Sequence, residues 1–181
     1  ASPDVALTWL VLSDLHGTPR RYDSPVDDTA LLGALYADIH ALATVGGAPS
    51  MLMVTGDVVH APLDENYDRA ATILSQIAEA SGANPSQIYV VPGNHDVDRE
   101  LLEDELDAVG IRAAIRANPH RFDRALAHYT EPLARPMGAF ERFAASLAKP
   151  NGGTSWPAMP APWWVHRMKV GGHSVRIVGW N

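Results

Sequence analysis

The sequence has no cysteine and few basic residues. Without cysteine there can be no disulfide bond, thiolate-bound zinc or cysteine nucleophile, so any metal ligands must be His, Asp, Glu or Asn. Eight His and 21 Asp plus Glu can supply them. The 14 Lys plus Arg leave a formal net charge of -7. That balance argues against a general nucleic-acid coat protein or a polybasic membrane binder.

The sequence also lacks an uninterrupted apolar run long enough to cross a membrane. The longest stretch without Asp, Glu, Lys or Arg runs from Ile39 to Gly56, and it is broken by Gly46, Gly47 and Pro49. The first residues, ASPD, lack the basic region and the apolar run of a signal peptide. We therefore expect no membrane partner and a cytoplasmic location.

Several enzyme signatures are missing as well. The sequence has no Gly-x-Gly-x-x-Gly turn, no Gly-Lys-Ser/Thr phosphate loop and no Gly-x-Ser-x-Gly elbow. Dinucleotide enzymes, P-loop NTPases and serine hydrolases are thereby excluded. The length of 181 residues fits a single domain.

Short apolar runs alternate with helical patterns in the first half of the chain. Continuous apolarity predicts strands covered on both faces at 7–12, 51–55 and 88–91. Helical spacing predicts amphipathic helices at about 27–44 and 67–80. Their apolar positions are Leu31, Leu32, Leu35, Ile39 and Leu42 in the first, and Ala71, Leu74, Ile77 and Ala78 before Gly82 in the second. This alternation predicts an α/β fold with a parallel sheet and right-handed crossovers.

The second half of the chain has a different pattern. Helical segments interrupted by Gly and Pro predict a helical insertion over about 97–148, followed by a Pro- and Gly-rich surface loop over 149–162. Strands are predicted at 163–170 and 174–180, joined by a tight hairpin at Gly171-Gly172-His173.

Each of the first three predicted strands runs into a polar cluster. Asp14 and His16 follow the first strand, Asp57 the second, and Asn94 and His95 the third. The carboxyl ends of parallel strands share one edge of a sheet, so we expect these clusters to converge. In extended backbone, residues i and i+2 point the same way, so Asp14 and His16 could reach one ion. Two carboxylates brought together there would repel unless a cation lay between them.

At these residues the sequence resembles the calcineurin-like metallophosphoesterases, whose motifs are Asp-x-His, Gly-Asp and Gly-Asn-His-Asp or Gly-Asn-His-Glu. All three occur in order, and the stretch VPGNHD at 91–96, directly after an apolar strand, is the specific one. The resemblance implies an αββα layered sandwich. It also implies a dinuclear site for two divalent ions (Mn, Fe, Zn or Mg). In it, Asp14 and His16 bind the first ion, Asp57 bridges, Asn94 binds the second, and His95 is the catalytic histidine.

The sequence departs from the family pattern in its second half. An isolated His and a later Gly-His-x-His segment complete the metal shells of the family, and we find no such pair here. Gly172-His173 matches only half of that segment, and we interpret His173 as a turn residue. We therefore expect 1–181 to be the N-terminal part of a metallophosphoesterase domain, with further domains in a longer chain. Ligands supplied from elsewhere and a degenerate site are the alternatives.

Two other residues near the motifs have open roles. His60 is a loop histidine that could lie near the rim of the site, and Asp96 could orient His95 or serve only the structure of its loop. Between residues 112 and 142, six Arg outnumber three acidic residues, so this segment carries +3. A basic segment beside a metal site would attract phosphodiesters, although solvated helix faces are the alternative.

These patterns predict a metal-dependent phosphoesterase that uses metal-bound hydroxide, preferably on phosphodiesters of nucleotides or nucleic acid. A phosphomonoesterase is the alternative within this class. A non-catalytic module that binds nucleotide or a partner with an incomplete metal site is the alternative outside it.

Overall fold

Three apolar runs form one parallel sheet in the computed structural model, which describes residues 7–16, 28–104, 106–128, 130–147, 163–170 and 172–180. The strands are β1 (Trp9–Leu12), β2 (Met51–Val54) and β3 (Ile88–Val90), in the order β1-β2-β3. Leu12 pairs with Val54, and Val54 with Val90, so the three strands end level with one another. The predicted parallel sheet is confirmed.

The strands differ in how well they are covered. Residues of β2 and β3 are almost entirely buried, as continuous apolarity predicted. In β1, Leu10 packs against the core, whereas Trp9 and Val11 are 54% and 50% exposed. The prediction of cover on both faces is therefore wrong for β1. Trp9 and Val11 lie on the face of β1 opposite to Leu10 and Leu12, which pack against the core.

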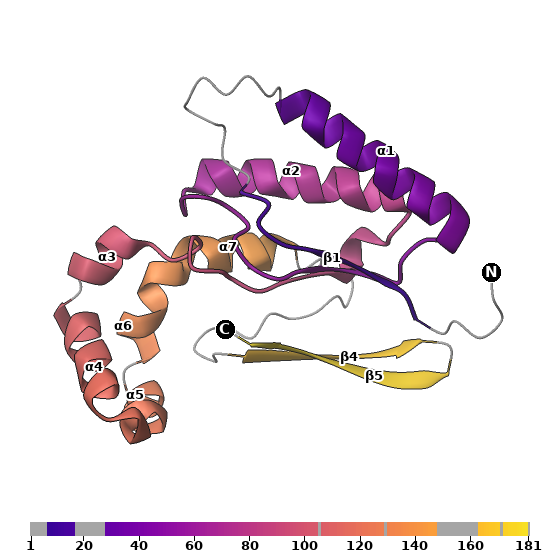
Figure 1. The fold of residues 1–181 in the computed structure, drawn as a ribbon. Coiled ribbons are helices and arrows are strands. Elements are labelled where there is room, and N and C mark those ends of the chain that lie inside the picture. Colours follow the sequence, from indigo (N-terminus) through magenta and orange to yellow (C-terminus); the bar gives the residue numbers. More distant parts are fainter. Residues whose placement is uncertain are drawn as a thin grey trace.

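Two long helices cover one face of this sheet (Figure 1). They are α1 (Asp28–Gly46) and α2 (Asp64–Ser81). In α2 the predicted apolar side is confirmed, with Leu74, Ile77 and Ala78 fully buried. Gly82 ends this helix at φ 70°, and its N–H is directed to the Ala78 and Glu79 carbonyls.

The buried side of α1 differs from the predicted one. Leu32, Leu35, Tyr36 and Ile39 pack on or in the core, whereas the predicted core positions Leu31 and Leu42 are 55% and 69% exposed. The helix is apolar around most of its circumference, so spacing alone did not determine which side faces the sheet.

Helix α1 also has the length and composition of a membrane span over Thr29–Gly46, the one such helix in the described part of the chain. In this fold it lies along α2. The Tyr36 hydroxyl donates to Gln76 Oε1 of α2 at 2.7 Å. Ile39 is part of the same core as the strands.

Short helices form the predicted insertion after β3, which confirms its helical character. The elements are α3 (Arg99–Asp104), α4 (Leu106–Ala117), η2 (Pro119–Arg121), α5 (Phe122–His128), α6 (Thr130–Ala134), η3 (Arg135–Met137) and α7 (Gly138–Leu147). Helix α7 returns to the core, where the Phe143 ring stacks on Tyr67 with centroids 4.9 Å apart. Figure 1 shows α3 to α6 on the side toward which the strands' carboxyl ends point.

A hairpin of β4 (Trp163–Val170) and β5 (His173–Trp180) forms a second sheet. Gly172 has φ 81°, and the predicted tight hairpin is confirmed. His173 was predicted as a turn residue, but it pairs with Val170 as the first residue of β5. The ring centroids of His166 in β4 and of Tyr89 in β3 are 5.0 Å apart. The hairpin lies on the side of the sheet away from α1 and α2 (Figure 1). Helices, sheet and second sheet give three of the four layers of an αββα sandwich. The predicted loop over 149–162 lies outside the described residues.

Candidate metal centre

The polar clusters that follow β1 and β2 converge at the edge of the sheet. Ligand atoms of Asp14, His16 and Asp57 all lie within 4.8 Å of one another. His16 Nε2 is 3.8 Å from Asp14 Oδ1. Two carboxylates and an imidazole are a donor set that suits Zn, Mn or Fe.

The backbone at these residues is unusual. Asp14, His16 and Asp57 have φ of 55°, 44° and 50°, and they are the only non-glycine residues with positive φ in the described ranges. The Asp14 and His16 N–H groups donate to the Gly56 and Asp57 carbonyls at 3.3 and 3.2 Å. The extended backbone expected for Asp14 and His16 is therefore wrong, although their side chains do meet. Left-handed non-glycine residues are uncommon and cluster at functional sites.

His16 also contains a buried polar atom that fits a ligand site. Its Nδ1 atom has no hydrogen-bond partner within the part of the chain that the structure describes. A buried polar atom without a partner costs free energy, which an ion or a water at this site would offset. The donor chemistry and the left-handed backbone fit a divalent cation held by Asp14, Asp57 and His16 Nε2, the ring nitrogen 3.8 Å from Asp14 Oδ1.

The turns after β2 and β3 press against each other. A Cβ added at Gly56, which has φ 117°, would lie 3.1 Å from the Gly93 Cα. The His95 N–H donates to Asp57 Oδ1 at 3.0 Å. Asn94 lies between Gly93 and His95 with an exposed side chain, so it belongs to this turn. Its role as a ligand of a second ion stays a prediction.

Asp96 links the two turns through hydrogen bonds. The residue is fully buried, and its Oδ2 accepts from the Gly93 N–H at 2.8 Å and the Val58 N–H at 3.1 Å. Its Oδ1 accepts from the Tyr67 hydroxyl at 3.0 Å and the Val59 N–H at 3.3 Å. Burial raises the pKa of the Asp96 carboxyl, and these four hydrogen bonds oppose that rise. Of the two roles left open for Asp96, its contacts favour the structural one.

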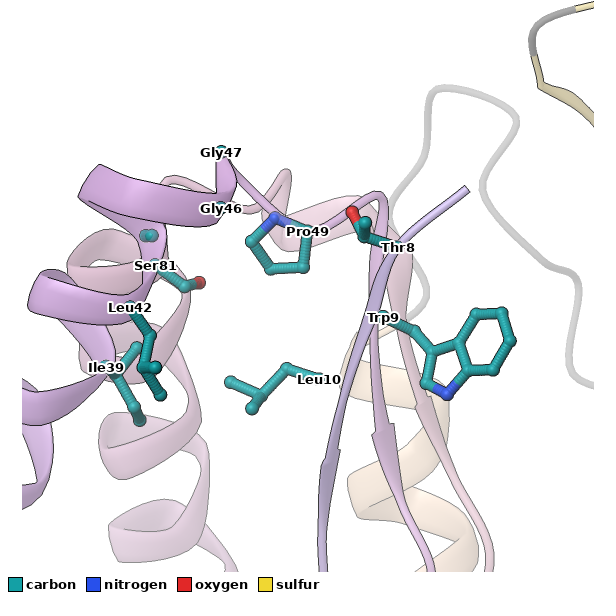
Figure 2. Close-up of a pocket in the computed structure, with 10 residues that line it drawn as sticks. Thr8, Trp9, Leu10, Ile39, Leu42, Gly46, Gly47, Pro49 and Ser81 are labelled. Carbon is teal, nitrogen blue, oxygen red and sulfur yellow. The ribbon is translucent and has the colours of Figure 1, made fainter. Parts of the chain in front are cut away.

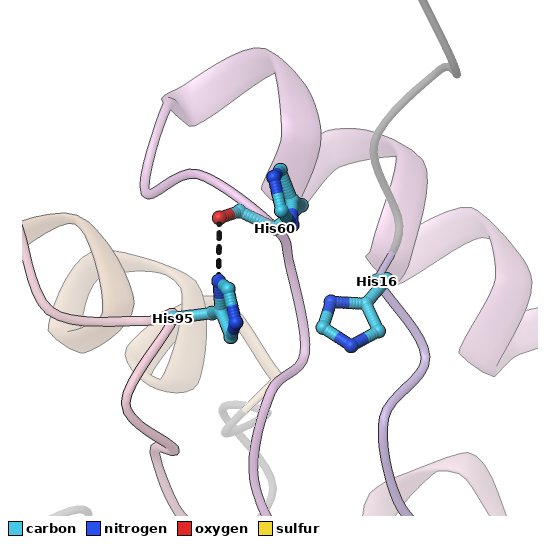
Figure 3. A group of neighbouring side chains, drawn as sticks. All are labelled: His16, His60 and His95. Atoms are coloured by element: carbon cyan, nitrogen blue, oxygen red, sulfur yellow. Dashed lines mark hydrogen bonds between the residues drawn. The ribbon is translucent and has the colours of Figure 1, made fainter.

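His60 belongs to the site as well, whereas sequence reasoning had placed it no more closely than a loop near the rim. One ring nitrogen each of His16, His60 and His95 lies within 4.8 Å of the other two. The His60 and His95 rings are stacked, with centroids 4.9 Å apart and planes at 27°. Figure 3 shows the three rings around one space, with His95 Nδ1 hydrogen-bonded to the His60 carbonyl at 3.1 Å. In the sequence, the signal for His60 was its position three residues after Asp57.

An apolar pocket of about 240 Å³ lies at the other end of the sheet (Figure 2). Trp9, Leu10 and Pro49 line it from the beginnings of β1 and β2, and Ile39 and Leu42 line it from α1. It contains no acidic or histidine side chain. The pocket is therefore separate from the candidate metal centre.

Gly93 gives a first test of this packing. An added Cβ would lie 2.7 Å from Asp57 Cγ and closer still to Asp57 N and Oδ1. We expect Gly93→Ala to lower the free energy of unfolding by about 1–3 kcal/mol, measured by urea denaturation. Gly110→Ala in α4, with nothing within 4 Å of its added Cβ, is the control and should be neutral or stabilising by up to about 1 kcal/mol. Equal stability of the two variants would contradict the close packing.

Comparison with known proteins agrees with this geometry. The family model for calcineurin-like phosphoesterases matches residues 7–161. An uncharacterized metallophosphoesterase-like protein, YydB of Bacillus subtilis (strain 168), is 30% identical over 93 residues. That alignment covers 51% of this chain and 18% of the Bacillus protein. The fold is that of a metallophosphoesterase, and the chain belongs to the calcineurin-like phosphoesterase family.

Proposed function

We propose that the chain carries the metal centre of a phosphoesterase that hydrolyses phosphodiesters of nucleotides or nucleic acid. The observation that supports this most directly is the convergence of Asp14, His16 and Asp57 within 4.8 Å at the carboxyl edge of a parallel sheet. The family match over residues 7–161 supports the same reaction class.

Asp14 and His16 would hold one ion, Asp57 would bridge to a second, and Asn94 would add a neutral oxygen to the second. When bound, two divalent ions neutralise the phosphoryl oxygens and activate water for in-line attack. The carboxylates supply the negative charge that retains the ions, and the left-handed backbone at Asp14 and Asp57 aims both side chains at one space. The number and identity of the ions are part of the proposal.

His95 would act on the substrate. Its Nδ1 faces the His60 carbonyl, which accepts hydrogen bonds only, so Nδ1 carries a proton. In the imidazolium form of His95, Nε2 would donate the proton that the leaving oxygen needs. Its backbone N–H is bonded to Asp57, so the ring is fixed relative to the metal ligands.

The preference for phosphodiesters rests on the Arg-rich helices beside the site. Two of the six Arg are neutralised, Arg135 by Glu131 at 3.0 Å and Arg142 by Asp64 at 2.8 Å. Arg116, Arg121 and Arg124 are exposed on α4, η2 and α5. They could attract a polyanionic substrate toward the edge where α3 to α6 lie. The cytoplasmic location and the further domains stay predictions.

Turnover of small model substrates tests the proposal. With added Mn²⁺, we expect the protein to hydrolyse an aryl phosphodiester faster than the matching phosphomonoester, and EDTA to abolish both rates, because the carboxylates cannot act without ions. Release of the aryl alcohol and elemental analysis of the dialysed protein are the measurements.

Each other outcome points to an alternative. A faster monoester rate would make the protein a phosphomonoesterase. Retained ions without hydrolysis of either ester would favour the non-catalytic module. A protein that retains no ions would contradict the metal centre itself.

A further inference from the structure

We propose that His60 is a substrate-binding residue whose imidazole donates a hydrogen bond to a phosphoryl oxygen beside His95. This inference rests on the proposed phosphoesterase function and adds a residue that the motifs do not assign. The starting observation is that His60 presents a ring nitrogen to the same space as His16 and His95. It is exposed, so a ligand can reach it.

The stacking of His60 on His95 argues against a common metal ion. An imidazole binds an ion through a lone pair in its ring plane, so two rings share an ion only where their planes meet. The two planes differ by only 27° with centroids 4.9 Å apart, so they meet far from both rings. The His16 and His95 planes, in contrast, differ by 83°. Stacked rings are unsuited to one ion.

The same arrangement suits an oxyanion. A phosphoryl group presents several separate oxygens, so two neighbouring rings can each donate to a different one. Asp14 and Asp57 form a second group of neighbouring ligand atoms that shares His16, and cations are needed there to balance their charge. The phosphoryl group would then lie between the ions and the two imidazoles. Its negative oxygens would face the ions on one side and N–H donors on the other.

The backbone around His60 fixes its position. The two preceding residues, Val58 and Val59, are fully buried, and their N–H groups donate to Asp96. The His60 carbonyl receives the His95 Nδ1 contact. Because that contact uses the main chain, replacing the His60 side chain leaves it in place. The contribution of the imidazole can therefore be measured separately from the orientation of His95.

His60→Ala is the test, with inorganic phosphate as the probe on Mn²⁺-loaded protein. We expect the phosphate dissociation constant from calorimetry to rise about tenfold, because a hydrogen bond to a charged group is lost. KM for the aryl phosphodiester should rise by a similar factor, and the metal content by elemental analysis should stay unchanged. His60→Gln, which retains an N–H donor, should recover part of the phosphate affinity.

His40→Ala is the matched control. His40 is exposed on α1, and its Nδ1 contacts the Ala80 carbonyl at 3.3 Å. It should match the wild type in every measurement. If His60→Ala leaves phosphate affinity unchanged, or lowers the metal content, the substrate-binding role is overturned while the proposed function stands. If the wild type binds neither ions nor phosphate, both proposals fail.

Discussion

Asp57→Asn should remove the bound ions and lower hydrolysis of an aryl phosphodiester by more than about 100-fold, since losing even an outer partner of a metal ligand costs 10–100-fold. Asn keeps the side-chain oxygen that accepts from the His95 N–H. Asn is also among the residues that best tolerate φ near 50°, the value at Asp57. The substitution therefore removes the charge and leaves the turn intact.

Metal content by elemental analysis and the initial rate with added Mn²⁺ are the measurements for this variant. Asp38→Asn, an exposed position on α1, removes the same charge away from the site and should retain wild-type values. Thermal unfolding of Asp57→Asn without metal should resemble that of the metal-free wild type. Unchanged ion content and turnover in Asp57→Asn would refute the assignment of the metal centre.

Asp96→Ala should lower the free energy of unfolding by at least about 3 kcal/mol, because it leaves a tyrosine hydroxyl and three main-chain N–H groups without their acceptor. Burial, and then the negative charge of Asp96, raises the pKa of the Tyr67 phenol, so this hydroxyl stays a donor. The loss should also reach the metal centre, since Asp96 holds Gly93 against Val58. Urea denaturation and metal content are the measurements.

A graded series separates this bond network from a general loss of charge. Tyr67→Phe removes one of the four donors and should cost about 1 kcal/mol. Asp107→Ala, exposed in the first turn of α4, should cost less than about 1 kcal/mol. If Asp96→Ala costs no more than Asp107→Ala, the network does not stabilise the two turns.

Much of the site was predictable because strand order determines where strand ends meet. Once three apolar runs are recognised as parallel strands, Asp14, Asp57 and Asn94 must lie at one edge of the sheet. The ordered motifs then distinguish a functional site at this edge from turns in which Asp and Asn have only a structural role. The helical insertion and the Gly171-Gly172 hairpin were also readable, because Pro and Gly constrain the backbone locally.

What the sequence could not predict depends on left-handed backbone and on packing. Periodicity predicts side-chain directions only within helices and strands. Asp57 has φ 50° and lies outside both, so the direction of the His60 side chain three residues later could not be predicted. The buried side of α1 was misjudged at Leu31 and Leu42 because an almost uniformly apolar helix offers no contrast between its faces. Contacts of Asp96 with Val58 and Val59 join residues that lie far apart in the sequence.

The close approach of Gly56 to Gly93 has a consequence for biosynthesis. Each turn uses hydrogen bonds supplied by the other, because Asp57 accepts from the His95 N–H and Asp96 accepts from the Val58 and Val59 N–H groups. A nascent polypeptide that ends after β2 would carry Asp14, His16 and Asp57 but would lack the Asp96 acceptor for the Val58 and Val59 N–H groups. Docking of β3 therefore completes the hydrogen bonds of the turn that carries Asp57.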